Sequence, residues 1–218
     1  MSIQDSRADM LARMRSRLGR NAAQDAEAAE RVAAALRAPV PAPRPPLPAD
    51  LTACFIERAL SMQSTVARIS VMHEVPQACA DYLARTCLPP TAVVWPQIAA
   101  LDWAGAGIEV VARAAQGEDL TGITGSFCAL AETGTLVLCS GPDSPATVSL
   151  LPETHIAIVD ASRILAGMEE AFALLRREAG GVPRSLNFVS GPSRTGDIEQ
   201  TIVLGAHGPS RVHLVVVG

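Results

Sequence analysis

Short apolar runs alternate with helical stretches over most of the chain. Several of the runs are apolar on successive residues, as strands buried on both faces are. The runs that predict strands are Ile69–Met72, Ala92–Trp95, Ile108–Val111, Leu136–Cys139, Ile156–Val159, Leu186–Val189 and Val212–Val217. Helices are predicted between some of them, at Pro76–Cys87 and Ser162–Arg177. This alternation predicts an α/β fold with an open, mainly parallel sheet flanked by helices.

Two helices of the predicted domain carry clear end signals. Asp50 is a good N-cap for a helix whose apolar positions are Leu51, Phe55, Leu60 and Val66. The helix predicted over Ser162–Arg177 ends with two arginines near its negative dipole end, and Gly180 follows.

The N-terminal part has a different pattern. Ser6 is predicted to cap a helix with a narrow apolar stripe, and Asn21 a second, alanine-rich helix that ends near Leu36. Six prolines follow between Pro39 and Pro48, which predict an extended spacer. We therefore expect an N-terminal helical arm over residues 1–38, a proline-rich linker over 39–49 and an α/β domain over 50–218.

The composition excludes several classes of chemistry. All 18 basic residues of the 218-residue chain are arginines. Without lysine there is no Schiff-base chemistry, no pyridoxal-phosphate anchor, no biotinyl or lipoyl attachment and no Walker-A phosphate site. The net charge of −4 offers no global electrostatic attraction to nucleic acid. The cationic contacts of any anion site must come from arginine, histidine or backbone amides.

The apolar runs and the cysteines indicate the cellular compartment in which we expect the protein. No apolar run approaches the roughly 18 residues that a membrane-spanning helix needs, and no secretory signal is visible at the N-terminus. The five cysteines are odd in number, contain no CxxC pair and lie mostly among apolar neighbours. We expect a cytoplasmic protein without a membrane span, whose thiols are reduced and mostly buried.

Three polar segments, two of them with glycines, interrupt the apolar pattern. The first runs from Gly122 to Thr135, and its last four residues, Glu132-Thr133-Gly134-Thr135, come directly before the strand predicted at Leu136–Cys139. One interpretation is a tight turn in which Gly134 supplies a positive φ. The other makes Glu132 a base or nucleophile, with the amides and hydroxyls of Thr133, Gly134 and Thr135 facing a ligand. The tetrapeptide alone favours the turn.

The second segment runs from Ser149 to His155 and enters the strand predicted at Ile156–Val159. His155 is a candidate proton carrier, because the pKa of a free histidine lies near 6.5. The alternative is a structural histidine that bonds a neighbouring carbonyl.

The third segment, from Ser190 to Glu199, follows the strand predicted at Leu186–Val189, and loops after strands are where open α/β sheets bind ligands. Ser193 or Thr195 is predicted to cap a short helix whose free N–H groups, with those of Gly191, face an anion. Arg194 adds a forked donor for a carboxylate or phosphate, which the acidic side chains Asp197 and Glu199 can orient. The alternative is a capped turn with an internal Arg–Asp pair.

His207 follows this segment and is the remaining site candidate. A triad of Ser193, Asp197 and His207 lacks the G-x-S-x-G elbow. His207 and His213 lack zinc-site spacing, and the cysteines form no iron–sulfur pattern. We therefore expect no metal or cofactor in this chain.

Taken in order, the three segments resemble the LUD domain of the lactate-utilisation protein C family (LutC/YkgG). The resemblance rests on Ala129–Leu138, Ser149–Ile156 and Ser190–Glu199, the last running into Val203–Pro209. It implies a fold similar to the NagB/RpiA/CoA-transferase group. Two departures stand out: Gly196 replaces the usual alanine, which loosens the expected helix start, and Ala146 lies where the family often has an arginine.

The resemblance implies a function in bacterial growth on L-lactate. Members of the family look like one of three co-encoded components that oxidise lactate to pyruvate, and the other two are iron–sulfur proteins. We therefore expect a non-redox accessory or substrate-handling subunit, with iron–sulfur clusters on its partner subunits and a small carboxylate as ligand. The alternatives are an independent CoA-transferase-like enzyme with Glu132 as nucleophile, and a carboxylate-binding regulatory module.

Overall fold

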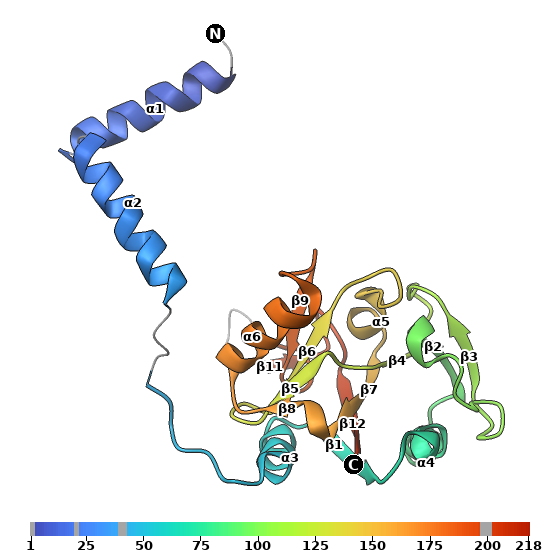
Figure 1. Ribbon diagram of the computed structural model, residues 1–218. Helices are drawn as coiled ribbons and strands as arrows, with labels where there is room; N and C mark the ends of the chain where they lie inside the picture. The colour runs from blue at the N-terminus through green and yellow to red at the C-terminus, as the bar shows by residue number, and fades with distance from the viewer. Residues whose placement is uncertain (1–2, 20–21, 39–42, 197–201) are drawn as a thin grey trace. The chain divides into compact units, whose positions relative to one another are not determined.

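The computed structural model describes residues 3–19, 22–38, 43–196 and 202–218, and the chain divides into two compact units, 1–45 and 46–218 (Figure 1). The first unit holds helices α1 (Ile3–Arg17) and α2 (Ala22–Arg37). Ser6 lies inside α1, so it is not the predicted cap, and Asn21 falls outside the described residues. The stretch 43–48 contains neither helix nor strand.

A six-stranded sheet forms the centre of the second unit. Its order is β1-β12-β7-β4-β2-β3, and all neighbouring strands are parallel. The strands are β1 (Thr65–Ile69), β2 (Thr91–Val94), β3 (Glu109–Ala112), β4 (Thr121–Thr124), β7 (Thr154–Asp160) and β12 (Arg211–Val217). The two long helices that pack on this sheet are α3 (Leu51–Ser61) and α4 (Val75–Arg85). The structure confirms the predicted α/β class.

A second sheet of four strands packs on the α3 side of the first. Its order is β8-β5-β6-β9, and β6 is antiparallel to both of its neighbours. Its strands are β5 (Cys128–Leu130), β6 (Thr135–Cys139), β8 (Ile164–Leu165) and β9 (Leu186–Val189), and helix α6 (Met168–Ala179) covers its outer face. Short elements are η1 (Met72–Glu74), η2 (Pro96–Ile98), η3 (Ala161–Arg163) and α5 (Thr147–Leu150).

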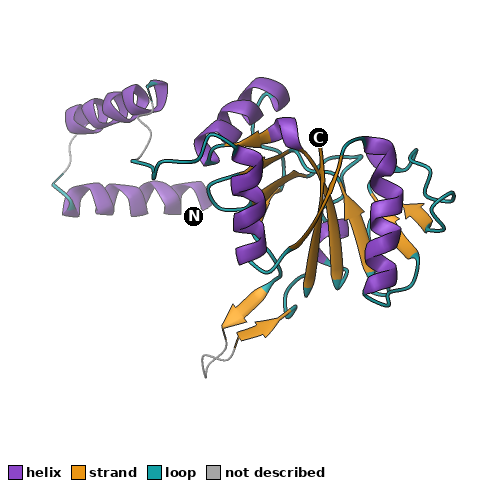
Figure 2. Ribbon diagram, turned by 90° about the horizontal axis from the view of Figure 1, so that it is seen from below, coloured by secondary structure: helices purple, strands orange, loops and turns teal. Residues whose placement is uncertain are grey.

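A β-hairpin extends away from the two sheets (Figure 2). It consists of β10 (Arg194–Gly196) and β11 (Ile202–Leu204), which pair antiparallel.

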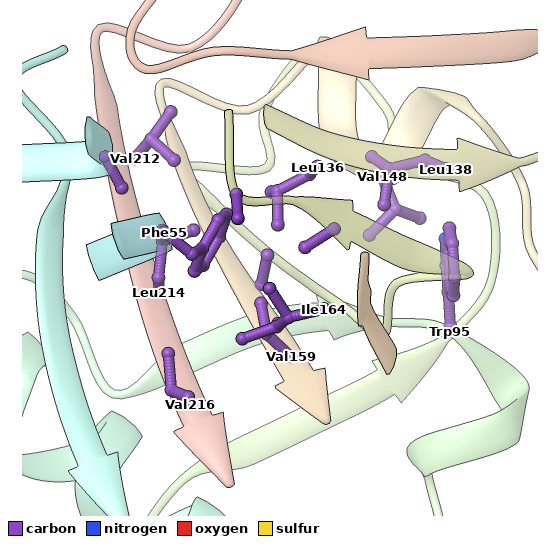
Figure 3. Packing of buried hydrophobic residues seen from close by; sticks show 14 of the residues in the cluster. Phe55, Trp95, Leu136, Leu138, Val148, Val159, Ile164, Val212, Leu214 and Val216 are labelled. Atoms are coloured by element: carbon purple, nitrogen blue, oxygen red, sulfur yellow. The ribbon is translucent and has the colours of Figure 1, made fainter. Parts of the chain in front are cut away.

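The core has two parts, one on each face of the six-stranded sheet. On one face Phe55 of α3 packs with Leu136 of the second sheet and with Leu214 of β12 (Figure 3). On the other face Tyr82 and Leu83 of α4 pack against the sheet. Alternate residues of β7 and β12 serve the two parts, which explains why these strands are apolar on successive positions.

Two predicted helix boundaries were wrong for local reasons, and the strand predicted at Ile69–Met72 lies instead at Thr65–Ile69. The helix that Asp50 caps ends at Ser61, and Val66 belongs to β1 instead. The cap itself forms as expected, because Ala53 N–H donates to Asp50 Oδ1 at 2.9 Å. The helix predicted from Ser162 begins only at Met168, since Ile164 and Leu165 pair with strand β5.

Strand β4 was missed altogether, although all four of its residues are buried at the centre of the sheet. Its sequence, Thr-Gly-Ile-Thr, has only one strongly apolar side chain and so reads as part of a loop. Gly122 is needed for packing, because a Cβ at this position would collide with the carbonyl oxygen of Val148 in α5.

The structure bears on two further expectations. No described helix combines the length and the apolar character that crossing a bilayer requires. All five cysteines are free, and Cys54, Cys79 and Cys128 are buried.

Candidate functional site

The segment Glu132–Thr135 forms the tight turn between β5 and β6. Gly134 has a φ of 64°, and the turn lies directly on helix α3. A Cβ on Gly134 would lie only 2.5 Å from the backbone nitrogen of Ala59. Glu132 is half-buried, and its backbone N–H donates to Ala166 O at 3.1 Å. The space next to Gly134 is therefore filled by the helix and is not available to a ligand.

The loop after β9 reaches the C-terminal end of the same helix. Gly191 has a φ of 74°, and a Cβ there would overlap the carbonyl oxygen of Met62, the C-cap residue of α3. Arg194 Nη2 donates a hydrogen bond of 2.6 Å to that same carbonyl. Because the last carbonyls of a helix lack intrahelical partners, this bond caps α3.

The short helix predicted around Ser193 and Thr195 does not form. Arg194–Gly196 is strand β10, and Thr195 pairs with Val203 of β11. The helix is replaced by a strand because Arg194–Gly196 forms backbone hydrogen bonds with Ile202–Leu204. Gly196 is therefore a residue of a strand, and the expectation that it loosens the start of a helix does not apply. Asp197 and Glu199 lie outside the described residues.

The ligand site was predicted in the loop after Leu186–Val189 because open parallel α/β sheets bind ligands beyond the carboxyl ends of their strands, and this loop does not follow such a strand. Leu186–Val189 is a strand with the predicted bounds, but it belongs to the four-stranded sheet and runs antiparallel to β6.

The second and third predicted segments nevertheless line one cavity of about 250 Å³, which we call the motif cavity. It lies where β7 and β12 begin, at the amino edge of the six-stranded sheet. Its polar and glycine lining includes Ser149, Ser190, Gly191, Ser193, His207 and Gly208.

Hydrogen bonds connect this cavity to the Glu132–Thr135 turn. Thr133 Oγ1 and Thr135 Oγ1 are 2.6 Å apart, and Thr135 Oγ1 and Ser190 Oγ are also 2.6 Å apart. Ser193 N–H donates to Pro209 O at 2.9 Å, which joins the loops on either side of the hairpin. The cavity is thus hydroxyl-rich, but among the residues that the structure describes no arginine lines it.

His155 does not reach the motif cavity. It is fully buried in β7, where Nε2 shares a 2.8 Å hydrogen bond with Thr124 Oγ1, and Nδ1 has no partner among the described residues. Burial lowers the pKa of His155 to about 4, so the ring is neutral at pH 7. This environment makes it a structural core residue with no exposed site to protonate.

His213 is a second buried histidine. Its ring stacks on Tyr82 with centroids 4.0 Å apart, and Nδ1 lies 2.8 Å from Thr65 Oγ1. Burial, aided by the charge of Arg85, lowers the pKa of His213 to about 4.

A second cavity, of about 220 Å³, lies at the carboxyl ends of β2 and β4. The chain leaves β2 toward β3 and leaves β4 in the opposite direction toward β7. Such a reversal is the switch point at which open parallel sheets bind ligands. The lining of this switch-point cavity includes Trp95, Gln97, Ser126, Ser144, Arg163 and Glu178.

Sequence reasoning missed Arg163. The predicted helix over Ser162–Arg177 placed it inside a helix, whereas it ends η3, shortly after β7. Its position just beyond the apolar run Ile156–Val159 was the signal that could have found it, because that run is a strand of the parallel sheet.

The match to a family model covers residues 97–217, more than half of the chain, and the model describes the LUD domain. The chain belongs to the LUD domain family. It is 43% identical over 129 residues to "Lactate utilization protein C" of Bacillus licheniformis, and 41% identical over 129 residues to that of Bacillus subtilis. Each match covers 56% of this chain and 53% of the relative. The chain thus spans about half the length of these relatives.

Two further similarities concern proteins with less specific names. An uncharacterised Neisseria meningitidis protein, NMB1437, is 40% identical over 88 residues, or 40% of this chain and 38% of that protein. The crystal structure of a DUF162 family protein from Deinococcus radiodurans superposes with a TM-score of 0.58 at 28% identity. The superposition covers 79% of this chain and all of the other, which supports the fold described above.

Substitution of Gly134 tests how tightly the turn lies on α3. Gly134→Ala is expected to lower the free energy of unfolding by about 2–4 kcal/mol, from the left-handed backbone and the contact with Ala59. Gly181→Ala is the control, since a Cβ there meets nothing within 4 Å, and it should change stability by less than about 0.5 kcal/mol. Urea denaturation measures both, and equal small effects would contradict the close contact.

The buried histidines predict a pH dependence of stability. In the unfolded chain both protonate near pH 6.5, whereas in the folded protein the pKa of each is about 4. The stability they provide is therefore complete above pH 6.5 and is lost as the pH falls toward 4, by up to about 1.4 kcal/mol per pH unit for each histidine. Urea denaturation between pH 7.5 and 4.5 measures this slope. His155→Gln should reduce it, and an unaltered slope would contradict the assignment.

Proposed function

We propose that the protein serves L-lactate utilisation as a non-redox subunit that handles a small carboxylate for iron–sulfur partner proteins. The observation that carries the proposal is its 41–43% identity over 129 residues to proteins named lactate utilization protein C. The LUD match over residues 97–217 also contains every residue that lines the motif cavity.

We propose that the partner proteins bind to the hairpin of β10 and β11. It extends from the domain, and Val203 and Leu204 are 45% and 46% exposed. Exposed apolar side chains on a short, isolated strand pair are suited to a protein contact. The base of the hairpin is fixed, because Arg194 is bonded to the end of α3.

The CoA-transferase-like alternative has less structural support. Glu132 lines neither the motif cavity nor the switch-point cavity, and the space beside its turn is taken by α3. A regulatory module that binds a carboxylate without partners would use the same cavities, so partner capture separates it from the proposed subunit.

Purification of the tagged protein from cells grown on L-lactate tests the proposed subunit role. The expected result is co-purification of proteins that contain iron and acid-labile sulfide, and no oxidation of L-lactate by the isolated chain with a dye acceptor. Robust lactate oxidation by the chain alone would contradict a non-redox role, and purification without any iron–sulfur protein would favour the regulatory module.

A single charge on the hairpin should disrupt partner capture. Val203→Asp is expected to lower the yield of co-purified iron–sulfur protein at least tenfold, because it places a carboxylate in the apolar contact. Val182→Asp is the matched control, since Val182 is 67% exposed and lies between α6 and β9, outside the hairpin. Equal yields for both variants would exclude the hairpin as the docking surface.

A further inference from the structure

The switch-point cavity collects residues that follow three parallel strands. Trp95 follows β2, Ser126 comes shortly after β4, and Arg163 comes shortly after β7. Trp95 lies at the opposite end of the core cluster from Val212, a residue of the motif cavity (Figure 3). The volume of about 220 Å³ is below the roughly 300–1,000 Å³ of pockets for drug-sized ligands, so the cavity suits a small molecule.

Three contacts fix the guanidinium of Arg163 in this cavity. Nε donates to Phe127 O at 2.6 Å, Nη2 donates to Glu178 Oε2 at 2.7 Å, and the group lies 5.0 Å from the centre of the Phe127 ring. Nη1 has no hydrogen-bond partner among the described residues. A fixed guanidinium with open donors is suited to a carboxylate, because little side-chain freedom remains to be lost on binding.

The two serines of the cavity can only accept further hydrogen bonds. Ser126 Oγ donates to Ile158 O at 2.9 Å, and Ser144 Oγ donates to Cys139 O at 2.8 Å. A hydroxyl has one proton, so each oxygen retains acceptor capacity only. A complementary ligand therefore needs an O–H or N–H donor beside its negative group.

The remaining lining residues limit the ligand further. The indole N–H of Trp95 is already bonded to Pro145 O at 3.1 Å, so its ring supplies an apolar wall. Glu178 is ionised, since the hydrogen bond from Arg163 holds the pKa of its carboxyl below the usual value. A ligand carboxylate in the cavity is thus repelled by Glu178 while it is attracted by Arg163.

We propose that the switch-point cavity binds a small 2-hydroxycarboxylate, with its carboxylate on Arg163 and its hydroxyl donating to Ser126 or Ser144. The site deepens the proposed function and rests on it for the identity of the ligand, since L-lactate is a 2-hydroxycarboxylate. The corresponding 2-keto acid has no hydroxyl proton to donate. Pyruvate should therefore bind about tenfold more weakly than L-lactate, the effect of one lost hydrogen bond.

Calorimetric titration of the full chain with L-lactate, pyruvate and L-alanine tests the site. Arg163→Gln should weaken L-lactate binding at least tenfold. Arg176→Gln makes the same charge change on the exposed side of α6, outside the cavity lining, and should leave binding unchanged. Equal binding of L-lactate by wild type and Arg163→Gln, or pyruvate binding as tight as L-lactate binding, would overturn the proposal.

Glu178→Gln tests the site through an expected gain of affinity, which a misfolded variant would not show. The amide keeps an acceptor for Arg163 but removes the repelling charge, so L-lactate should bind several-fold more tightly than to the wild type. Unchanged or weaker L-lactate binding by this variant would overturn the proposal, and so would L-alanine binding that is tighter than L-lactate binding in the wild type and is lost in the variant, because only a zwitterion needs the Glu178 carboxylate.

The binding experiments and the co-purification experiment can fail independently of each other. Co-purification of iron–sulfur proteins without L-lactate binding would overturn this site and leave the subunit role standing. Specific L-lactate binding that depends on Arg163, without any iron–sulfur partner, would support the site and contradict the subunit role.

Discussion

Two turns lie so close to the backbone of helix α3 that no side chain fits between them and the helix. Gly134 lies against Ala59, and Gly191 lies against Met62, both with positive φ. These contacts bring the turn before β6 and the loop after β9 onto one rigid element. The motif cavity, the hydrogen bond between Thr135 and Ser190, and the position of the hairpin all depend on this arrangement.

The two proposed sites lie at opposite edges of one sheet. At the amino edge the motif segments are tied to α3, and the exposed hairpin begins there. At the carboxyl edge the switch-point cavity holds an arginine with an open donor. Arg194 and Arg163 illustrate the difference, because both donate to backbone carbonyls but only Arg163 lines one of the two cavities.

The central strands β7 and β12 were predicted well because they are buried on both faces and are therefore apolar on successive residues. The edge strand β1 is less buried, and it lies at Thr65–Ile69 where a strand was predicted at Ile69–Met72. Strand β4 escaped, since Thr121–Thr124 is buried through backbone packing and small side chains. Leu186–Val189 was predicted with its observed bounds, but nothing in four residues says which sheet they join. Which strand a segment pairs with depends on residues that are distant in the chain. For this reason the ligand site predicted after Leu186–Val189 differs from the cavity at the carboxyl edge of the parallel sheet.

The same limit applies to individual side chains. The turn around Gly134 could be predicted from its local residue types, whereas the hydrogen bond from Arg194 to Met62 joins residues 132 positions apart. His155 was a candidate proton carrier or a structural histidine by sequence, and the strands on either side bury it completely. Local conformation could thus be predicted from the sequence, whereas the contacts and burial of individual side chains could be known only from the order of the strands.

A backbone-amide NMR titration of the protein with L-lactate tests the assignment of these two sites most directly. The account predicts that the saturable chemical-shift changes centre on Ser126, Phe127 and Arg163, while Ser193 and His207 keep their positions. Changes centred on the loops around the motif cavity, with the switch-point cavity unaffected, would contradict it.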